Sequence, residues 1–381
     1  MRQRGNGEGS IYQRADGRWA GSLSLGYVDG KPRRKHVYAR TRAEVAARLT
    51  RLQNDVQRGL PVPDERLMVA RFLETWLESI RPSVRPSTFG AYSSYVEHHL
   101  NPGLGRVKLS KLTPQQVEGF LADQEAAGLS PRTVNHMRTI LRTALNRAMA
   151  WGLLYRNVAA LAAPRHLSTT EPQVLTPQQA VALIDGVRAD RLGALYITAL
   201  TLGLRLGEAL GLQWQDIDLQ GGTLRVRQAL QRSDGAAHFV EPKSQTSRRT
   251  VKLPFITHGA LREHRRRQLE ERLRARPEWN GLDLVFCTLA GRPLNPSSTT
   301  RRFRQVLADL GLPQMRFHDL RHSAATLLLA KGTHPRLVME LLGHSQVSLT
   351  LNTYSHVVGE MQDVTATQMD AVLQAAAGLD R

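Results

Sequence analysis

Two proline-containing stretches divide this chain, and they constrain its fold more than any other feature of the sequence. The first covers residues 61–66, and the second runs from Ala162 to Gln173. Proline lacks a backbone N–H and interrupts regular structure, so both stretches are predicted linkers. A chain of 381 residues is also too long for one ordinary hydrophobic core. We therefore expect three domains, at residues 1–60, 67–162 and 174–381.

The first domain has the pattern of a small β-sheet followed by one helix. Within residues 10–40, short apolar segments are separated by Asp-Gly turn signals. Thr41 and Glu44 then have the spacing of a helix-capping box. Apolar residues recur on one helical face from Val45 to Val56, which predicts a helix packed on the sheet.

The second domain is predicted to be helical throughout. Apolar residues between Val69 and Ile80 follow the i, i+3, i+4, i+7 spacing of a buried helix face. Further helices are expected to begin near Ser87, Thr113 and Ser130.

The third domain opens with a short repeat. Residues 175–179 repeat residues 112–116 letter for letter, which indicates the same helix-start chemistry used twice. Helices dominate afterwards, apart from one β region. Its predicted strands are residues 223–227 and 250–253, with a turn at residues 233–235 between them.

The charge of the chain indicates a large acidic partner. Lys and Arg outnumber Asp and Glu by 52 to 33, which gives a net charge of +19. DNA, RNA and an anionic membrane surface all fit such a balance. The excess is spread along the chain, which favours folded domains with basic faces over a disordered basic arm.

DNA contact is predicted for two groups of basic residues. In each case a solvated, charged surface would give the same pattern. The charge of the whole chain favours contact with phosphates instead. The residues are Lys31, Arg33, Arg34 and Lys35 in the first domain, and Arg138 and Arg142 in the last helix of the second.

Several other classes of protein are disfavoured by the sequence. The N-terminal residues have no apolar core, so no signal peptide is expected, and no apolar run is long enough to span a membrane. The single cysteine, Cys287, lies in an apolar run and is expected to be a buried core thiol. A reducing cytoplasm fits these features.

Neither a nucleotide cofactor nor a metal is expected. The chain has no Gly-x-x-x-x-Gly-Lys-Ser/Thr loop and no His-Glu-x-x-His motif. His318 and His322 have the i, i+4 spacing that can bind zinc on a helix, but no third ligand stands in obvious reach.

Five short motifs in the third domain stand out from this background. Each is weak alone, because short patterns recur by chance, but together they form an ordered set. They are Gly203-Leu204-Arg205 with Glu208, Lys243 before a run of Ser, Thr and Arg, His318-Asp319-Leu320-Arg321, Leu342-Gly343-His344, and Tyr354.

In this order and with these gaps, the motifs resemble the signature of the tyrosine recombinases, the phage integrase family. The resemblance covers residues 175–360 closely. Residues 67–160 are similar in pattern only to the family's helical core-binding domain. Residues 8–58 resemble the small sheet-plus-helix domain with which some integrases bind secondary DNA sites. The implied fold is multidomain and mainly α, with an α+β catalytic domain.

The resemblance implies a role for each motif residue. Arg205 and Arg321 would clamp the non-bridging oxygens of a phosphodiester and stabilise its transition state. Arg205 follows an apolar run, residues 199–204, which we interpret as an apolar helix that contains it, so it needs an anionic partner. Glu208 can orient it.

Tyr354 would be the nucleophile that forms a 3′-phosphotyrosyl link and frees a 5′-hydroxyl. Lys243, on a β-hairpin loop, would be the general acid for the leaving 5′-oxygen. His318 would help to handle the tyrosine proton, and His344 would hydrogen-bond the phosphate. One departure from the family is Leu202, where many members have threonine; an apolar replacement in a helix puts little in doubt.

The resemblance also implies partners. Double-stranded DNA attachment sites are expected, with a tetramer on two synapsed sites and DNA-bending accessory proteins, and without a cofactor. Apolar residues between Val357 and Leu373 are partly helical in spacing and can pack either on the same protomer or on a neighbour.

Three alternatives compete with this interpretation. A type IB topoisomerase uses the same residue types, and two-domain chromosome-dimer recombinases are similar but lack the N-terminal segment found here. A transcription regulator with a relic active site is a third possibility. A pure DNA binder has no need to keep the catalytic set, and all its positions are filled here.

Overall fold

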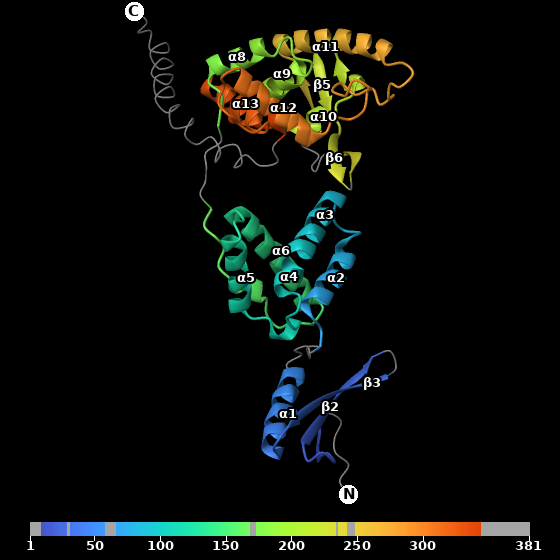
Figure 1. Cartoon of the computed structure of the whole chain (residues 1–381), viewed down its shortest axis with the longest axis vertical. Helices are drawn as coiled ribbons and strands as arrows, with labels where there is room; N and C mark the ends of the chain where they lie inside the picture. The colour runs from blue at the N-terminus through green and yellow to red at the C-terminus, as the bar shows by residue number, and fades with distance from the viewer. Residues whose placement is uncertain are drawn as a thin grey trace, which may run out of the picture. The chain divides into compact units, whose positions relative to one another are not determined.

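The computed structural model describes residues 9–28, 31–57, 66–167, 173–233, 235–241 and 248–343 (Figure 1). The chain divides into two compact units, residues 1–169 and 170–381. Three of the predicted catalytic residues, Lys243, His344 and Tyr354, lie outside the described residues.

The N-terminal unit begins with a three-stranded antiparallel sheet and a helix. The strands β1 (Ser10–Gln13), β2 (Trp19–Val28) and β3 (Lys31–Ala39) pair in that order, and α1 (Arg42–Gln57) packs on them. Ala20, Leu23, Val45 and Leu49 are buried between sheet and helix. The hydroxyl of Thr41 accepts the backbone N–H of Glu44 at 3.2 Å, so the predicted helix start is confirmed.

A helical bundle with its own hydrophobic core forms the rest of this unit. The apolar face predicted for the first helix is buried, with Phe72, Leu73 and Trp76 at 1% exposure or less. The elements are α2 (Val69–Ile80), α3 (Pro86–Tyr95), a π-helical stretch (Val96–Leu100), α4 (Asn101–Leu104), a 3-10 turn (Leu109–Lys111), α5 (Pro114–Ala126), α6 (Pro131–Ala150) and α7 (Val158–Leu161).

The repeated five-residue sequence begins a helix both times. Thr113 caps α5 and Thr176 caps α8 (Pro177–Gly186), each through a complete capping box with the glutamine three residues later. Proline stands at the first helical position in both, where no N–H is needed. The prediction from the repeat is confirmed.

The second unit combines helices with two small sheets. Strands β4, β5 and β8 form one antiparallel sheet, and β6 and β7 form a separate hairpin. After α8 come α9 (Gly193–Leu202), α10 (Leu206–Leu210), a 3-10 turn (Trp214–Asp216), β4 (Ile217–Asp218), β5 (Thr223–Val226), β6 (Ala229–Ser233), β7 (Ala236–Val240), β8 (Arg249–Lys252), α11 (Phe255–Arg274), α12 (Pro296–Asp309), α13 (Asp319–Ala330) and α14 (Pro335–Leu342).

The β region differs from its prediction in one respect. The turn at residues 233–235 does not join the two predicted strands but connects β6 to β7, an additional hairpin. The predicted strands themselves, β5 and β8, pair with each other, with Val226 opposite Arg249.

The buried helix α9 is the centre of the second unit. It contacts both α11 and α13 (Figure 1). Residues 193–200 are all buried, so its C-terminal end is held in a fixed place in the core. Cys287 is also buried, as predicted, and burial raises the pKa of its thiol. Among the described residues, no helix has the length and apolar character needed to cross a membrane.

Candidate active site

A sharp turn after α9 positions the first motif. Gly203 adopts a left-handed conformation, with φ of 61°, and ends the helix. Arg205 therefore lies on the turn, at the N-cap of α10, and its side chain is 40% exposed. The prediction that Arg205 lies within an apolar helix was wrong, because the apolar run continues past the point where glycine ends the helix.

Glu208 is the anionic partner of Arg205. Arg205 Nη1 donates to Glu208 Oε1 at 2.7 Å, and the backbone N–H of Arg205 donates to Oε2 at 3.1 Å. The carboxylate is 4% exposed. Burial by itself raises the pKa of Glu208, but the positive charges and hydrogen bonds of Arg249 and Arg205 outweigh it and hold the pKa below its usual value. Glu208 is therefore ionised at neutral pH.

Arg321 brings a second motif to the same turn. It lies in the first turn of α13, is 1% exposed, and donates from Nη1 to the carbonyl oxygen of Gly203 at 2.8 Å. A Cβ on Gly203 would lie 2.2 Å from Leu342 Cδ2. Motifs that are 118 residues apart in the chain thus meet at one glycine.

His318 and His322 lie on either side of Arg321 at the start of α13. Their rings meet edge to face with centroids 5.2 Å apart. His318 is accessible to solvent, yet desolvation by its surroundings and the positive charges of His322, Arg321 and Arg205 lower its pKa to about 4. Burial likewise lowers the pKa of His322. Both imidazoles are neutral at physiological pH.

The other motif residues, Lys243, His344 and Tyr354, come after described segments in the sequence. In the sequence, Lys243 comes between β7 and β8. The residues described on either side of it, Glu241 and Arg248, form an ion pair of 2.5 Å. His344 comes after Gly343, which ends α14 in a left-handed conformation with φ of 67°. The placement of Lys243, His344 and Tyr354 remains a prediction.

Sequence reasoning missed Arg249, whose side chain is 7% exposed and reaches Glu208 Oε2 at 3.0 Å. It stands in a run of basic residues after Lys243 and has no spacing signal of its own. Its contacts with Glu208, across 41 residues, and with Leu341, across 92 residues, identify it.

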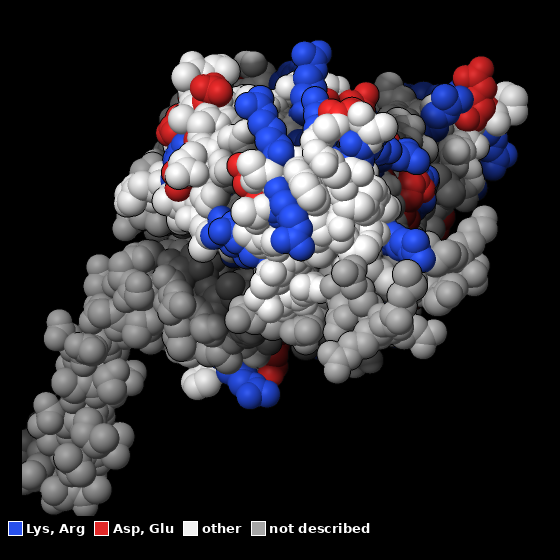
Figure 2. Space-filling view, turned by 90° about the horizontal axis from the view of Figure 1, so that it is seen from below, with Lys and Arg blue, Asp and Glu red and all other residues white. Residues whose placement is uncertain are grey.

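The structure describes the predicted DNA-binding residues in part. Arg34 is exposed and Lys35 half-buried on β3, whereas the side chains of Lys31 and Arg33 lie outside the description. Figure 2 shows Lys and Arg side chains covering more of the described surface in that view than Asp and Glu side chains.

The two arginines of α6 differ from each other. Arg138 donates to the carbonyl oxygens of Ala162 at 2.6 Å and Ala160 at 3.3 Å, so its guanidinium helps to hold α7 on α6. Arg142 is exposed. DNA contact by either arginine stays a prediction.

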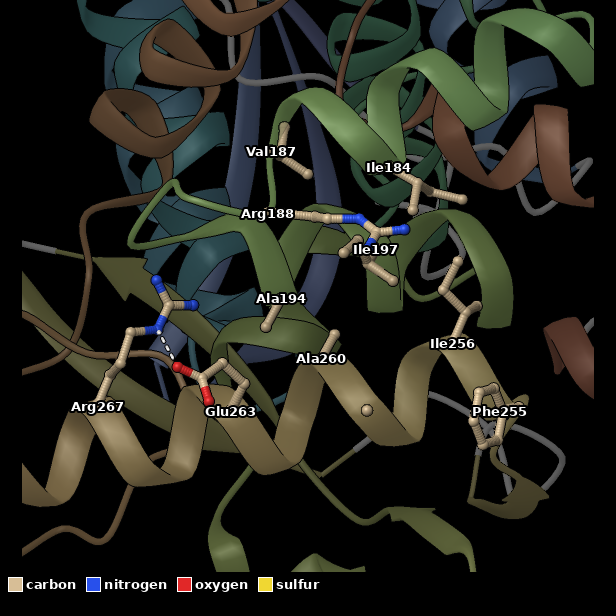
Figure 3. A pocket seen from close by; sticks show the side chains of 11 residues that line it. Ile184, Val187, Arg188, Ala194, Ile197, Phe255, Ile256, Ala260, Glu263 and Arg267 are labelled. Carbon is tan, nitrogen blue, oxygen red and sulfur yellow. Dashed lines mark ion pairs between the residues drawn. The ribbon is translucent and has the colours of Figure 1, made fainter.

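The described residues contain a pocket away from the motifs and no cluster of metal ligands. Within the described ranges, no three His, Cys, Asp or Glu side chains lie together as metal ligands would. A pocket of about 410 Å³ lies between α8, α9 and α11, with apolar walls that include Ile184, Ile197 and Ala260 (Figure 3). Glu263 and Arg267 form a 4.0 Å ion pair at its rim. None of the described motif residues lines this pocket.

Comparisons with known proteins identify the family of this chain. Residues 173–360 match the model of the phage integrase family, and residues 69–123 match the N-terminal SAM-like domain of phage integrases. An integrase of Saccharopolyspora erythraea is 31% identical over 422 aligned positions, covering 96% of both chains.

Solved structures share the fold. The Tn1549 transposon integrase, in complex with a circular intermediate DNA, superposes with a TM-score of 0.68 at 21% identity, covering 78% of this chain and 99% of that one. A lambda integrase tetramer bound to a Holliday junction gives 0.56 at 18% identity, covering 89% and 96%.

The chain belongs to the phage integrase family of tyrosine recombinases. It is an enzyme of site-specific DNA recombination.

Proposed function

We propose that this recombinase integrates or excises a phage or another mobile element through a covalent 3′-phosphotyrosyl intermediate on Tyr354. The observation that carries the proposal is the meeting of Arg205 and Arg321 at the Gly203 turn. Arg321 donates to the Gly203 carbonyl, and Arg205 leaves the same turn two residues later. Two guanidiniums held in this way can bind one phosphate.

The arginines supply positive charge at the place where the reaction develops negative charge. Attack on a phosphodiester adds negative charge to the non-bridging oxygens, and guanidinium groups stabilise that charge through paired hydrogen bonds. Arg321 is held in the core and cannot relax away, while Arg205 is 40% exposed and open to a ligand. Removal of one such donor from a preorganised site costs about 10²–10³-fold in rate.

Proton transfers complete the step. The hydroxyl oxygen of Tyr354 attacks phosphorus, and the bond to the 5′-oxygen breaks. A neutral His318, with its pKa lowered to about 4, has a ring nitrogen free to accept the tyrosine proton. Lys243 gives a proton to the leaving 5′-oxygen, and His344 hydrogen-bonds the phosphate. The phosphotyrosyl ester keeps the energy of the broken bond, so rejoining needs no nucleotide cofactor.

The assembly that we propose is a tetramer on two synapsed attachment sites in double-stranded DNA. The lambda integrase with the same fold forms a tetramer on a Holliday junction. DNA-bending accessory proteins assist it, and the reaction takes place in the cytoplasm.

We further propose three functional domains, at residues 1–60, 67–162 and 174–381. The sheet with α1 and the helical bundle have separate buried cores, which supports a division of the first unit. The bundle holds the crossover site with Arg142 and Arg138, and the sheet binds a secondary site with Lys31, Arg33, Arg34 and Lys35. Two tethered binding modules raise each other's effective concentration on DNA.

A recombination assay tests the proposal. Two plasmids carry the sequences that flank the two ends of the element encoding this chain. Purified protein should join them, and sequencing of both junctions should show a short identical core where strands exchanged. Relaxation of supercoils without any exchanged junction would instead indicate a topoisomerase and overturn the proposal.

A further inference from the structure

Arg249 occupies a junction between three of the catalytic motifs. It is the first residue of β8 and comes six residues after Lys243. Its register is fixed by pairing with Val226 on β5, and its side chain is 7% exposed. A charged side chain in such a place needs partners that repay its desolvation.

One partner is the carboxylate of Glu208. Arg249 Nη2 donates to Oε2 at 3.0 Å, while Arg205 Nη1 uses the other oxygen, Oε1, at 2.7 Å. The carboxylate thus lies between two guanidiniums. It carries one negative charge against two positive charges, so the group of three keeps one positive charge for a phosphate.

A second partner is the end of α14. Arg249 Nε donates to the carbonyl oxygen of Leu341 at 2.6 Å. The last carbonyls of a helix have no partner within the helix, and a cation there is favoured by the helix dipole. Leu342 and Gly343 follow directly and lead to His344. The contact therefore fixes the point from which the chain leaves α14 toward the Leu342-Gly343-His344 motif.

We propose that Arg249 is a positioning residue for DNA cleavage, which holds Glu208, the end of α14 and the start of β8 in one arrangement. The inference rests on the proposed function. Arg249 does not touch the phosphate itself. It takes up part of the negative charge of Glu208, so that Arg205 is not neutralised and can bind the phosphate.

Single-turnover cleavage of a nicked duplex tests this role in the full-length protein. The duplex carries the crossover sequence found from the junctions above, and loss of the short end strand traps the covalent complex. Arg249→Ala should bind this DNA with unchanged affinity and cleave it about 100-fold more slowly, the cost of a small misplacement in an active site. If Arg249→Ala does not fold, Arg249→Lys replaces it, since an ammonium keeps the charge but lacks the fork that reaches both acceptors.

A second substitution separates positioning from general loss of structure. Without Arg249, Glu208 is paired with Arg205 alone and neutralises it. Glu208→Gln in the Arg249→Ala background should therefore speed cleavage by about tenfold, within the range of coupling between residues of one network. A merely structural role predicts that the second substitution adds further damage.

Arg191 provides the matched control. Like Arg249, it donates to both a carboxylate and a backbone carbonyl: its guanidinium lies 2.8 Å from the Glu271 carboxylate and 2.8 Å from the carbonyl oxygen of Cys287. It belongs to the same unit as Arg249 but lies in none of the motifs. Arg191→Ala should lower the melting temperature and leave the cleavage rate unchanged below it.

The outcomes distinguish this inference from the proposed function. If the wild-type protein forms no covalent complex, the proposed function fails first. If it does and Arg249→Ala cleaves at the wild-type rate, or Glu208→Gln gives no recovery, the positioning role is wrong.

Discussion

The guanidinium of Arg321 donates a 2.8 Å hydrogen bond to the carbonyl oxygen of Gly203, and this contact joins the two arginine motifs of the recombinase. Arg321 is 1% exposed, so the bond forms in the core and does not compete with water. Arg205 stands two residues beyond that carbonyl. The position of one arginine therefore determines the position of the other.

Gly203→Ala should destabilise the second unit. At φ of 61° an alanine costs about 1–2 kcal/mol, and its Cβ would lie 2.2 Å from Leu342 Cδ2. Overpacking adds about 1–3 kcal/mol, so thermal melting should occur several degrees lower. Gly222 also has φ of 61°, but a Cβ there would meet nothing within 4 Å, so Gly222→Ala carries only the backbone cost. Equal melting temperatures for the two variants would show that the Leu342 contact is unimportant.

Arg321→Lys should abolish most cleavage while the protein still binds DNA. Lysine keeps the positive charge but cannot donate to both the Gly203 carbonyl and a phosphate from one rigid fork. We expect cleavage to fall by about 10²–10³-fold in single-turnover assays on the nicked duplex. Gel-shift titration of the same duplex provides the binding measurement. A rate within a factor of a few of wild type would contradict the clamp.

The sequence predicts those parts of the site that depend on residues close together in the chain. Thr113 and Thr176 predict helix starts correctly because a capping box lies within four residues. Arg205, Arg321 and Glu208 are identifiable from ordered motifs. The end of α9 was misplaced, because a helix buried on all sides has no polar face to mark where it stops.

Contacts between segments far apart in the chain could not be predicted from the sequence. Arg249 meets Leu341 across 92 residues, and nothing local distinguishes it from its basic neighbours. The hairpin of β6 and β7 was missed because its turn signal, at residues 233–235, was placed between the two predicted strands, residues 223–227 and 250–253. The hydrogen bonds of Arg138 to the carbonyl oxygens of Ala160 and Ala162 join residues 22 and 24 positions apart, so nothing in the sequence indicated them.

His318 should stay neutral down to about pH 5. Desolvation and the charges of His322, Arg321 and Arg205 lower its pKa to about 4, whereas in the unfolded chain it is close to 6.5. The unfolded state therefore binds the proton first, so stability is lost as the pH falls from about 6.5 to about 4 and is unaffected above that window. NMR titration of the His318 ring gives the midpoint directly; a midpoint above 6 would contradict the lowered value.

His318→Gln removes this contribution and should lose less stability on acidification. The measurement is urea unfolding at pH 7 and pH 5, compared between the variant and the wild type. Some acid sensitivity should remain, because burial also lowers the pKa values of His322 and His264. If the unfolding free energy falls by the same amount between pH 7 and pH 5 in the variant and the wild type, His318 is not a source of the acid sensitivity.

Deletion of residues 1–60 should separate two kinds of DNA binding. The shortened protein should cleave an isolated crossover site at nearly the full rate, because the paired arginines and the helical bundle remain. Recombination that depends on longer flanking DNA should be impaired, since the bivalent attachment is lost. Footprints on a full attachment site give the readout. Protection of the same flanks with and without the segment would mean that it adds no separate site.

The most direct test of the account concerns Tyr354. On the nicked duplex, the wild-type protein should form a complex that survives denaturing electrophoresis, and peptide mapping should find the DNA attached to Tyr354. Tyr354→Phe should bind the duplex equally well, because its phosphate contacts are intact, and form no such complex. A covalent complex that persists in Tyr354→Phe, or that maps to another residue, would contradict the phosphotyrosyl mechanism.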